Sequence, residues 1–122
     1  MPIVDVRPVV SDARTLPDDA AQMLADSFGR VLSAKAGRIW VRVTELPDGR
    51  YAENDATVED NDLPVFVQVL HADWPQEEAR IKESAALAEA VAISLGRKID
   101  RVHVEYAPPG RGRIAFGGKL VL

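Results

Sequence analysis

The sequence predicts an α+β fold in which a strand–helix–strand unit occurs twice within one domain. This pattern runs through the first half and returns in the second, and each half opens on a proline followed by a valine-rich run, at Pro2 and Pro64. A length of 122 residues and a hydrophobic content of 47% suit a single domain with one core. Because parallel crossovers are right-handed, two such units give a four-stranded mixed sheet with both helices on one face. The expected parts are a first half (1–46), a connecting loop or hairpin (47–63), a second half (64–107) and a C-terminal tail (108–122).

The first half has the pattern of a strand, a helix and a second strand. The run from Ile3 to Val10 is short, apolar and rich in β-branched residues, which is typical of a strand. Thr15 and Asp18 have the spacing of a capping box and predict a helix start, and Gly37 predicts the end of that helix. Residues alternate in polarity from Ile39 to Glu45, which predicts a half-buried strand. The apolar positions of the helix fall on one face: Leu24, Phe28, Val31 and Leu32.

The connecting segment leads into a third strand and a second helix. Pro47-Asp48-Gly49 predicts a turn, and the acidic stretch from Tyr51 to Asp62 predicts an exposed loop or a hairpin excursion. Alternation from Val65 to Leu70 predicts the third strand. Asp73 with Gln76 is a second capping-box candidate, so a helix is predicted to follow.

The second half closes with a helix end, a fourth strand and a tail. Gly96 predicts the C-terminal cap of the helix. Alternation from Val102 to Tyr106 predicts the fourth strand, and the segment from Ile114 to Leu122 is an apolar tail. The predicted apolar face of the second helix consists of Ile81, Ala85, Ala88, Val91, Ala92 and Leu95.

Composition and charge exclude several classes of function. A formal net charge of −4 lacks the basic surface of a nucleic-acid binder. The absence of cysteine excludes disulfides, thiolate metal sites and cysteine nucleophiles. The chain has only two histidines, so we do not expect a zinc site built from several histidines. The longest apolar run, Ala85 to Leu95, is too short and too polar to cross a bilayer, and the start of the chain has no signal-peptide pattern. We therefore expect a cytoplasmic protein without a membrane or nucleic-acid partner.

The predicted sheet has one face without a cover. Trp40, either Val65 or Phe66, and the apolar tail all need burial that two helices on the other face do not provide. Exposed apolar surface of this kind marks an interface, so the sequence favours an oligomer.

Pro2 is the strongest candidate for a catalytic residue. Initiator methionine is usually removed before a small residue, and removal of Met1 leaves proline with a free secondary amine. An ordinary α-amino group has a pKa of about 7.7–8.0, and burial lowers it by disfavouring the charged form. A neutral amine on a rigid ring can then accept a proton from carbon as a general base.

Several segments resemble the tautomerase superfamily, and the resemblance covers nearly the whole chain. They are the opening MPIVDVRP, the doubled strand–helix–strand pattern and the closing RVHVEYAPPGRGRIAFGGKLVL. The chain is most similar to the branch of 5-carboxymethyl-2-hydroxymuconate isomerases and macrophage migration inhibitory factors, and RIWVRVTELPDGRYAEND most resembles the former. The resemblance implies a homotrimer with active sites near the subunit boundaries. It also implies a small carboxylate substrate from aromatic-compound catabolism, and no metal or organic cofactor.

The resemblance implies a role for three residues at the substrate carboxylate and the reacting carbon. Pro2 matches the catalytic base of the family. Lys35 and Arg38 lie where relatives place a cation for the carboxylate, which arginine can bind with two parallel hydrogen bonds. The alternative for both is a solvated charge near a helix end.

Four further residues are candidates for substrate binding. His103 lies where one branch of the family has a tyrosine beside the proline, and it can donate a hydrogen bond to an enolate oxygen or simply pack in a strand. Glu105 is on the same strand face. Phe116 matches an aromatic wall, with core or interface packing as the alternative. Arg42 can point into a pocket or pair with an acid across the sheet.

Three functions stay open at this stage. The first is an isomerase in which Pro2 moves a proton on a 2-hydroxydienoate or 2-keto acid. The second is a cofactor-free dehalogenase or decarboxylase on the same scaffold, which is disfavoured because HADWPQ, after the third strand, lacks the arginine those relatives have there. The third is a trimeric binding module without catalysis.

Overall fold

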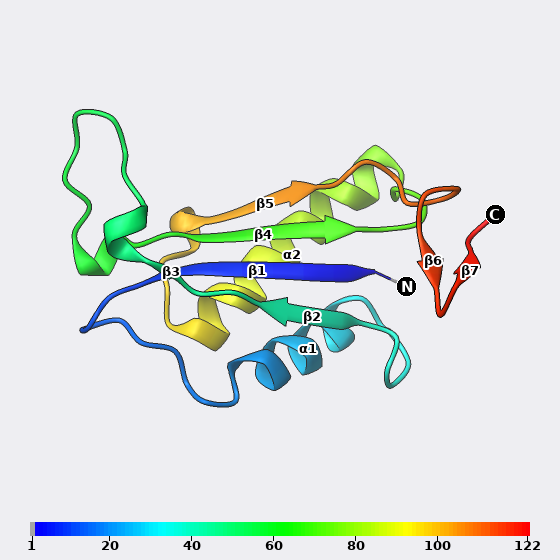
Figure 1. Cartoon of the computed structure of the whole chain (residues 1–122), viewed down its shortest axis with the longest axis horizontal. Coiled ribbons are helices and arrows are strands. Elements are labelled where there is room, and N and C mark those ends of the chain that lie inside the picture. The colour runs from blue at the N-terminus through cyan, green and yellow to red at the C-terminus, as the bar shows by residue number, and fades with distance from the viewer. Residues whose placement is uncertain (1) are drawn as a thin grey trace.

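A computed structural model describes residues 2–122 as an open sheet with two helices packed against one of its faces (Figure 1). The end of the sheet where β1 begins also carries a small C-terminal hairpin, and the connecting segment extends from the opposite end. The strands of the sheet are β1 (Ile3–Val10), β2 (Trp40–Val43), β3 (Leu46–Pro47), β4 (Val65–Leu70) and β5 (Val102–Tyr106). The helices are α1 (Ala20–Val31) and α2 (Glu77–Leu95), and the hairpin consists of β6 (Ala115–Phe116) and β7 (Lys119–Leu120).

The sheet topology confirms the doubled strand–helix–strand unit. The strand order is β2-β1-β4-β5, with β3 pairing with the end of β1. The pairs β1–β2 and β4–β5 are parallel, as a helical crossover requires, and the central pair β1–β4 is antiparallel. The sheet is therefore mixed, and both helices lie on one face, as predicted.

The core lies between the sheet and the helices and is almost entirely aliphatic. Alternate residues of the central strands point into it, because successive side chains of a strand face opposite sides. Leu24 and Phe28 from α1, and Leu87 and Val91 from α2, close the core with no exposed surface. The strand contribution is a set of valines: Val4, Val6, Val65, Val67, Val69 and Val102.

Both predicted capping boxes are wrong, although the helices exist. Helix α1 begins after Asp19 and α2 after Gln76, and neither residue makes a side-chain capping hydrogen bond. Asp73 binds Arg111 of the C-terminal segment instead, so its carboxylate is not available to the helix. The predicted cap at Gly96 is confirmed, since this residue has the left-handed conformation with φ of 65°.

Helix α1 ends earlier than predicted and α2 presents a different face. The left-handed backbone at Ser33, with φ of 49°, ends the α1 region before Gly37. On α2, Ile81 is 62% exposed and Ala85 is also exposed, so both were wrongly assigned to the buried face. The position of the sheet selects the side of α2 that carries Leu87 for the core.

The strand β2 is shorter than predicted, but its alternation is confirmed. Val41 and Val43 pack against the core, whereas Trp40 is 43% exposed on the open face. Val65 is buried on the helix side and Phe66 lies on the open face, which settles the alternative left by the sequence. The uncovered face therefore carries two large aromatic side chains.

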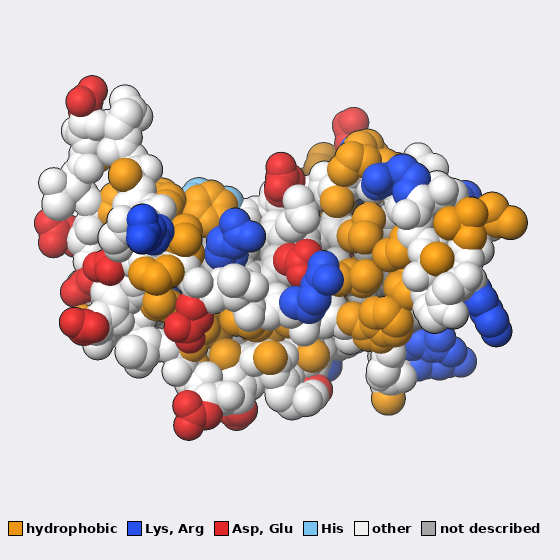
Figure 2. Space-filling model, viewed as in Figure 1, with side chains coloured by type: hydrophobic (Ala, Val, Ile, Leu, Met, Phe, Trp, Pro, Cys, Tyr) orange, Lys and Arg blue, Asp and Glu red, His pale blue; other side chains and the backbone are white. Residues whose placement is uncertain are grey.

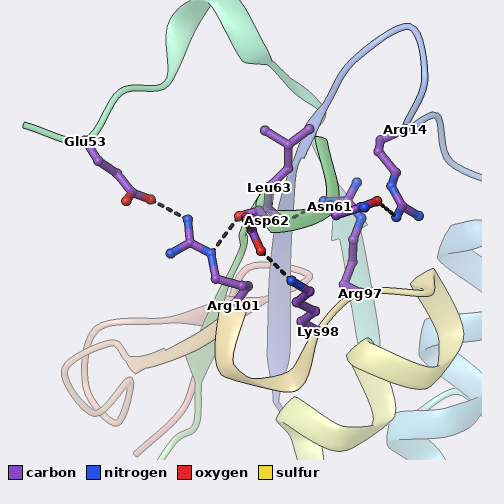
Figure 3. A network of polar contacts seen from close by, with 8 residues as sticks. All are labelled: Arg14, Glu53, Asn61, Asp62, Leu63, Arg97, Lys98 and Arg101. Carbon is purple, nitrogen blue, oxygen red and sulfur yellow. Dashed lines mark hydrogen bonds and ion pairs between the residues drawn. The ribbon is translucent and has the colours of Figure 1, made fainter. Parts of the chain in front are cut away.

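The acidic connecting segment is an excursion held by ion pairs rather than a freely solvated loop (Figure 3). Asp62 binds Lys98 at 2.6 Å, and its carbonyl oxygen accepts a hydrogen bond from Arg101 at 2.6 Å. Arg101 also binds Glu53, next to the bridge between Glu53 and Ala56. Hydrogen bonds from the Tyr51 hydroxyl and from Arg101 lower the pKa of the Glu53 carboxyl group, and the hydrogen bond from Lys98 lowers that of Asp62. The segment is thus fixed to the turn between α2 and β5.

Replacing Leu87 by alanine removes a fully buried side chain from α2, so we expect the free energy of unfolding to fall by about 2–5 kcal/mol. Ile93→Ala on the same helix is the matched control, because Ile93 is 75% exposed. Its effect is expected to stay within about 0.5 kcal/mol. Urea unfolding at one fixed protein concentration measures both, and equal losses in the two variants would contradict the assignment of the core.

Candidate active site around Pro2

A cavity of about 440 Å³ surrounds Pro2 at the start of β1. Pro2 is buried, and its carbonyl oxygen accepts a hydrogen bond from the backbone N–H of Trp40 at 3.2 Å, which fixes it beside β2. The cavity walls come from the segment after α1, the end of β4 and helix α2: Leu32, Ala34, Arg38, Ile39, His71 and Glu83.

The strand pairing explains why these segments meet. In the antiparallel pair β1–β4, Ile3 lies opposite Leu70, so the residue that follows β4 falls next to Pro2. That residue is His71. Because β5 is parallel to β4, the end of β5 at Tyr106 arrives at the same edge of the sheet.

Two polar residues of the cavity lining, His71 and Glu83, form a hydrogen-bonded group with Tyr106. His71 Nε2 lies 3.0 Å from Glu83 Oε2, and the Tyr106 hydroxyl donates to the same oxygen at 2.6 Å. The rings of His71 and Tyr106 stack, with 6.0 Å between their centroids. Burial and the hydrogen bond to Glu83 raise the pKa of the Tyr106 hydroxyl, which therefore remains a donor.

The sequence did not point to this group as functional. Its one available signal is the position of His71, directly after a strand predicted to lie in the same sheet as the strand that follows Pro2. Glu83 and Tyr106 carry no such signal, because their contact with His71 depends on how α2 and β5 pack.

The predicted carboxylate-binding residues separate in the structure. Arg38 lies in the wall of the Pro2 cavity and is exposed, and it makes no ion pair with any residue from 2 to 122. Lys35 lines a different hollow beside α1, together with Arg30 and Gly37. Of these two predicted cations, Arg38 is the one that lines the Pro2 cavity.

His103, Glu105 and Arg42 lie on the open face of the sheet rather than in the Pro2 cavity of their own subunit. They line a larger hollow of about 820 Å³. Glu105 accepts a hydrogen bond from Gln68 at 3.3 Å, and the ring of His103 lies 5.5 Å from that of Phe66. His103 and Glu105 share a face, as the strand period requires.

Arg42 pairs with an acid across the sheet, the second of its two predicted alternatives. Its guanidinium binds both carboxylate oxygens of Asp5, at 2.6 and 2.9 Å. This hydrogen-bonded pair raises the pKa of Arg42. The arginine is occupied within the subunit.

Phe116 packs edge-on against Trp40, with 5.0 Å between ring centroids. The Trp40 indole N–H donates to the carbonyl oxygen of Gly37 at 3.0 Å. The hairpin that carries Phe116 thus closes over the strand next to Pro2, but Phe116 is not among the residues that line the Pro2 cavity. Its role as an aromatic wall for substrate stays a prediction.

Two further observations concern metals and membranes. Within residues 2–122, no three side chains of histidine, aspartate or glutamate gather as metal ligands. No helix in the same range is both long and apolar enough to cross a bilayer.

Solved structures similar to this chain cover nearly all of it. Pt0534, crystallised after inactivation by 2-oxo-3-pentynoate, is 19% identical with a TM-score of 0.73, covering 98% of this chain and 94% of its own. The Q0 fused 4-OT, a symmetric trimer, is 16% identical with a TM-score of 0.75 and the same coverage of both chains, 98% and 94%. The macrophage migration inhibitory factor of Trichinella spiralis is 13% identical with a TM-score of 0.70, over 97% and 98%.

No protein-family model matches the sequence, and no curated protein matches it in sequence. TM-scores of 0.70 to 0.75 over nearly the whole chain establish a shared fold at identities below one fifth, so the predicted α+β fold with two strand–helix–strand units is confirmed.

The position of Tyr106 has a spectroscopic consequence. In a Tyr51→Phe variant Tyr106 is the only tyrosine of the chain. Because its pKa is raised, we expect little tyrosinate at about pH 10, where an ordinary tyrosine is half ionised. Ultraviolet absorbance during an alkaline titration measures this ionisation, and half-ionisation at the ordinary pH in the folded protein would contradict the buried hydrogen bond to Glu83.

Proposed function

We propose that this chain is a cytoplasmic, cofactor-free isomerase that moves a proton on a small 2-hydroxydienoate or 2-keto acid. The specific activity that we propose is that of a 5-carboxymethyl-2-hydroxymuconate isomerase. The observation that carries the proposal is the buried Pro2 at the start of β1, in a cavity that Arg38 also lines and where Arg38 makes no ion pair with any of residues 2–122. The shared fold with the fused 4-OT and the migration inhibitory factors supports it.

The cavity suits a neutral amine once Met1 is removed. Leu32 and Ile39 provide apolar wall on one side of Pro2, and Arg38 provides a positive charge. Desolvation and a neighbouring cation both disfavour the charged amine, so each lowers its pKa. The amine can then take a proton from carbon at neutral pH and return it elsewhere on the substrate.

Arg38 supplies the carboxylate site. Its guanidinium has five donors and can hold a carboxylate in two-point fashion beside Pro2. It is the only lysine or arginine among the described residues that line this cavity.

Two arginines contact the HADWPQ segment: Arg111 is bound to Asp73, and Arg80 donates a hydrogen bond to the carbonyl oxygen of Pro75. The site therefore favours isomerisation over dehalogenation or decarboxylation, and we expect no chloride from 3-haloacrylates and no CO₂ from malonate semialdehyde.

A homotrimer covers the open face of the sheet in this proposal. Figure 2 looks onto that face and shows hydrophobic side chains gathered toward the end that carries the C-terminal hairpin. Trp40, Phe66 and Leu120 are 43%, 37% and 50% exposed. Two solved structures with this fold are described as trimers, one symmetric and one asymmetric.

Trimer formation also gives His103 and Glu105 access to substrate. Both point away from the helix side of the sheet and lie apart from the Pro2 cavity of their own subunit. We therefore place their action on substrate bound at the Pro2 of a neighbouring subunit. Phe116 and Lys35 stay candidates for the rim of that site.

Pro2→Ala tests the proposal, because alanine also allows removal of Met1 but provides a flexible primary amine outside the ring. We expect the rate of ketonisation of 2-hydroxymuconate or phenylenolpyruvate to fall by about 10²–10⁴-fold. Pro64→Ala is the matched control, since Pro64 opens the equivalent strand of the second half, and it should keep the wild-type rate. Intact mass spectrometry first establishes that Met1 is absent from each protein.

Equal rates in the wild-type protein and in Pro2→Ala would refute catalysis by Pro2. A folded trimer with no activity on any keto or enol acid would instead indicate the binding module.

A further inference from the structure

The geometry points to His71 as a second proton-transfer group of this site, held in one tautomer by Glu83 and Tyr106. In this assignment, His71 takes the proton from the enol oxygen of the substrate while the protonated amine of Pro2 delivers a proton to carbon. The inference rests on the proposed function, which needs both an acid and a base for ketonisation.

The hydrogen bonds define which nitrogen of His71 is free. Glu83 Oε2 accepts from the Tyr106 hydroxyl at 2.6 Å and lies 3.0 Å from His71 Nε2. A carboxylate only accepts, so the neutral imidazole carries its hydrogen on Nε2. The lone pair is then on Nδ1, and the side-chain hydrogen bond of the His71 ring within residues 2–122 is made by Nε2 alone. A free lone pair on a histidine that lines the cavity is the arrangement of a general base.

The backbone of His71 is also fixed. Its carbonyl oxygen accepts a hydrogen bond from the N–H of Gly110 at 2.8 Å. A Cβ atom at Gly110 would lie 3.3 Å from that oxygen and 3.0 Å from Ile114 Cγ2, so the close approach favours glycine there. His71 is therefore held at two points, at the ring by Glu83 and at the backbone carbonyl by Gly110.

Burial makes a chance arrangement costly. The side chains of His71 and Glu83 are only 14% and 12% exposed. A carboxylate that is buried to this extent without hydrogen-bond partners would strongly destabilise the fold. Here one carboxylate oxygen is shared by two donors, as in catalytic sites where an acid orients a histidine. Glu83 and Tyr106 are accordingly positioning residues, and His71 is the group that meets the substrate.

The titratable groups around His71 come from four parts of the chain. Glu83 of α2 and Tyr106 of β5 form the hydrogen-bonded group, and Arg80 of α2 acts on Tyr106 by its charge. Arg38 from the segment after α1 and Pro2 line the same cavity as His71. His71 and the Pro2 amine carry one exchangeable proton between them. Ketonisation starts with this proton on the Pro2 amine and ends with it on His71. The reverse reaction, in which the neutral amine takes a proton from carbon, starts with it on His71.

The reaction balances without a cofactor. The O–H bond of the enol breaks and its proton forms an N–H bond at His71 Nδ1. The oxygen electron pair forms the carbonyl double bond, and the carbon–carbon π pair takes the proton released when one N–H bond of the Pro2 ammonium breaks. No atom is oxidised or reduced, and water returns the proton from His71 to Pro2 between turnovers.

His71→Gln tests the assignment through the pH dependence of phenylenolpyruvate ketonisation. Wild-type activity should fall at acidic pH as His71 becomes protonated and at alkaline pH as the Pro2 ammonium is lost. We expect His71→Gln to lower kcat by about 10²-fold, to change KM little and to abolish the acid-side fall. Glu83→Gln should move the acid-side fall to lower pH, because the imidazolium loses its carboxylate partner.

Glu89→Gln is the matched control, an exposed glutamate on the same helix, and should leave the profile unchanged. An unchanged kcat and acid-side fall in His71→Gln would overturn the inference, as would a rise in KM alone. If His71→Gln does not fold, nitrogen NMR can determine the tautomer of His71 in the wild-type protein. A hydrogen on Nε2 supports the inference, and a hydrogen on Nδ1 overturns it. Loss of activity in Pro2→Ala with no effect of His71→Gln would leave the proposed function standing and remove only this inference.

Discussion

The antiparallel pairing of β1 with β4 is the contact on which the rest of the molecule depends. It joins the two strand–helix–strand halves into one sheet, and its register places Ile3 opposite Leu70. A shift of this register by one residue would turn the valines of one of the two central strands out of the core, because side chains alternate along a strand. The same register brings His71 to Pro2. Core and candidate site are therefore set by one set of backbone hydrogen bonds.

Much of the fold was predictable because burial leaves a periodic trace in the sequence. The alternation from Val65 to Leu70 and from Val102 to Tyr106 identifies strands that face a core on one side only. Helix starts were not predictable from side-chain caps, since Asp19 and Gln76 make no capping hydrogen bond. Ile81 was misassigned because a helix with apolar residues on several sides does not reveal which side meets the sheet.

The candidate site was predictable only in part. Pro2 and Arg38 could be predicted because both belong to segments whose place in the resemblance is clear, and the structure brings them to one cavity. His71, Glu83 and Tyr106 come from β4, α2 and β5, and their contact follows from packing that no local pattern encodes. His103 and Glu105 show the opposite case, since their shared strand face was evident while their distance from Pro2 within the subunit was not.

The arginines of the open face and of the Pro2 cavity differ in their partners. On the open face, Arg42 is bound to Asp5, while in the Pro2 cavity Arg38 makes no ion pair with a described residue. Arg38 therefore lies beside the buried Pro2 with its guanidinium available to an anionic ligand, and His71 and Glu83 line the same cavity.

The ionisation of Pro2 tests the central claim most directly. Nitrogen NMR of protein labelled in proline can follow the amine of Pro2 through a pH titration. A free amine in this cavity should titrate below the ordinary α-amino value of about 7.7–8.0. A nitrogen that does not titrate, as in an amide with Met1 retained, or one that titrates at or above the ordinary value, would contradict the account.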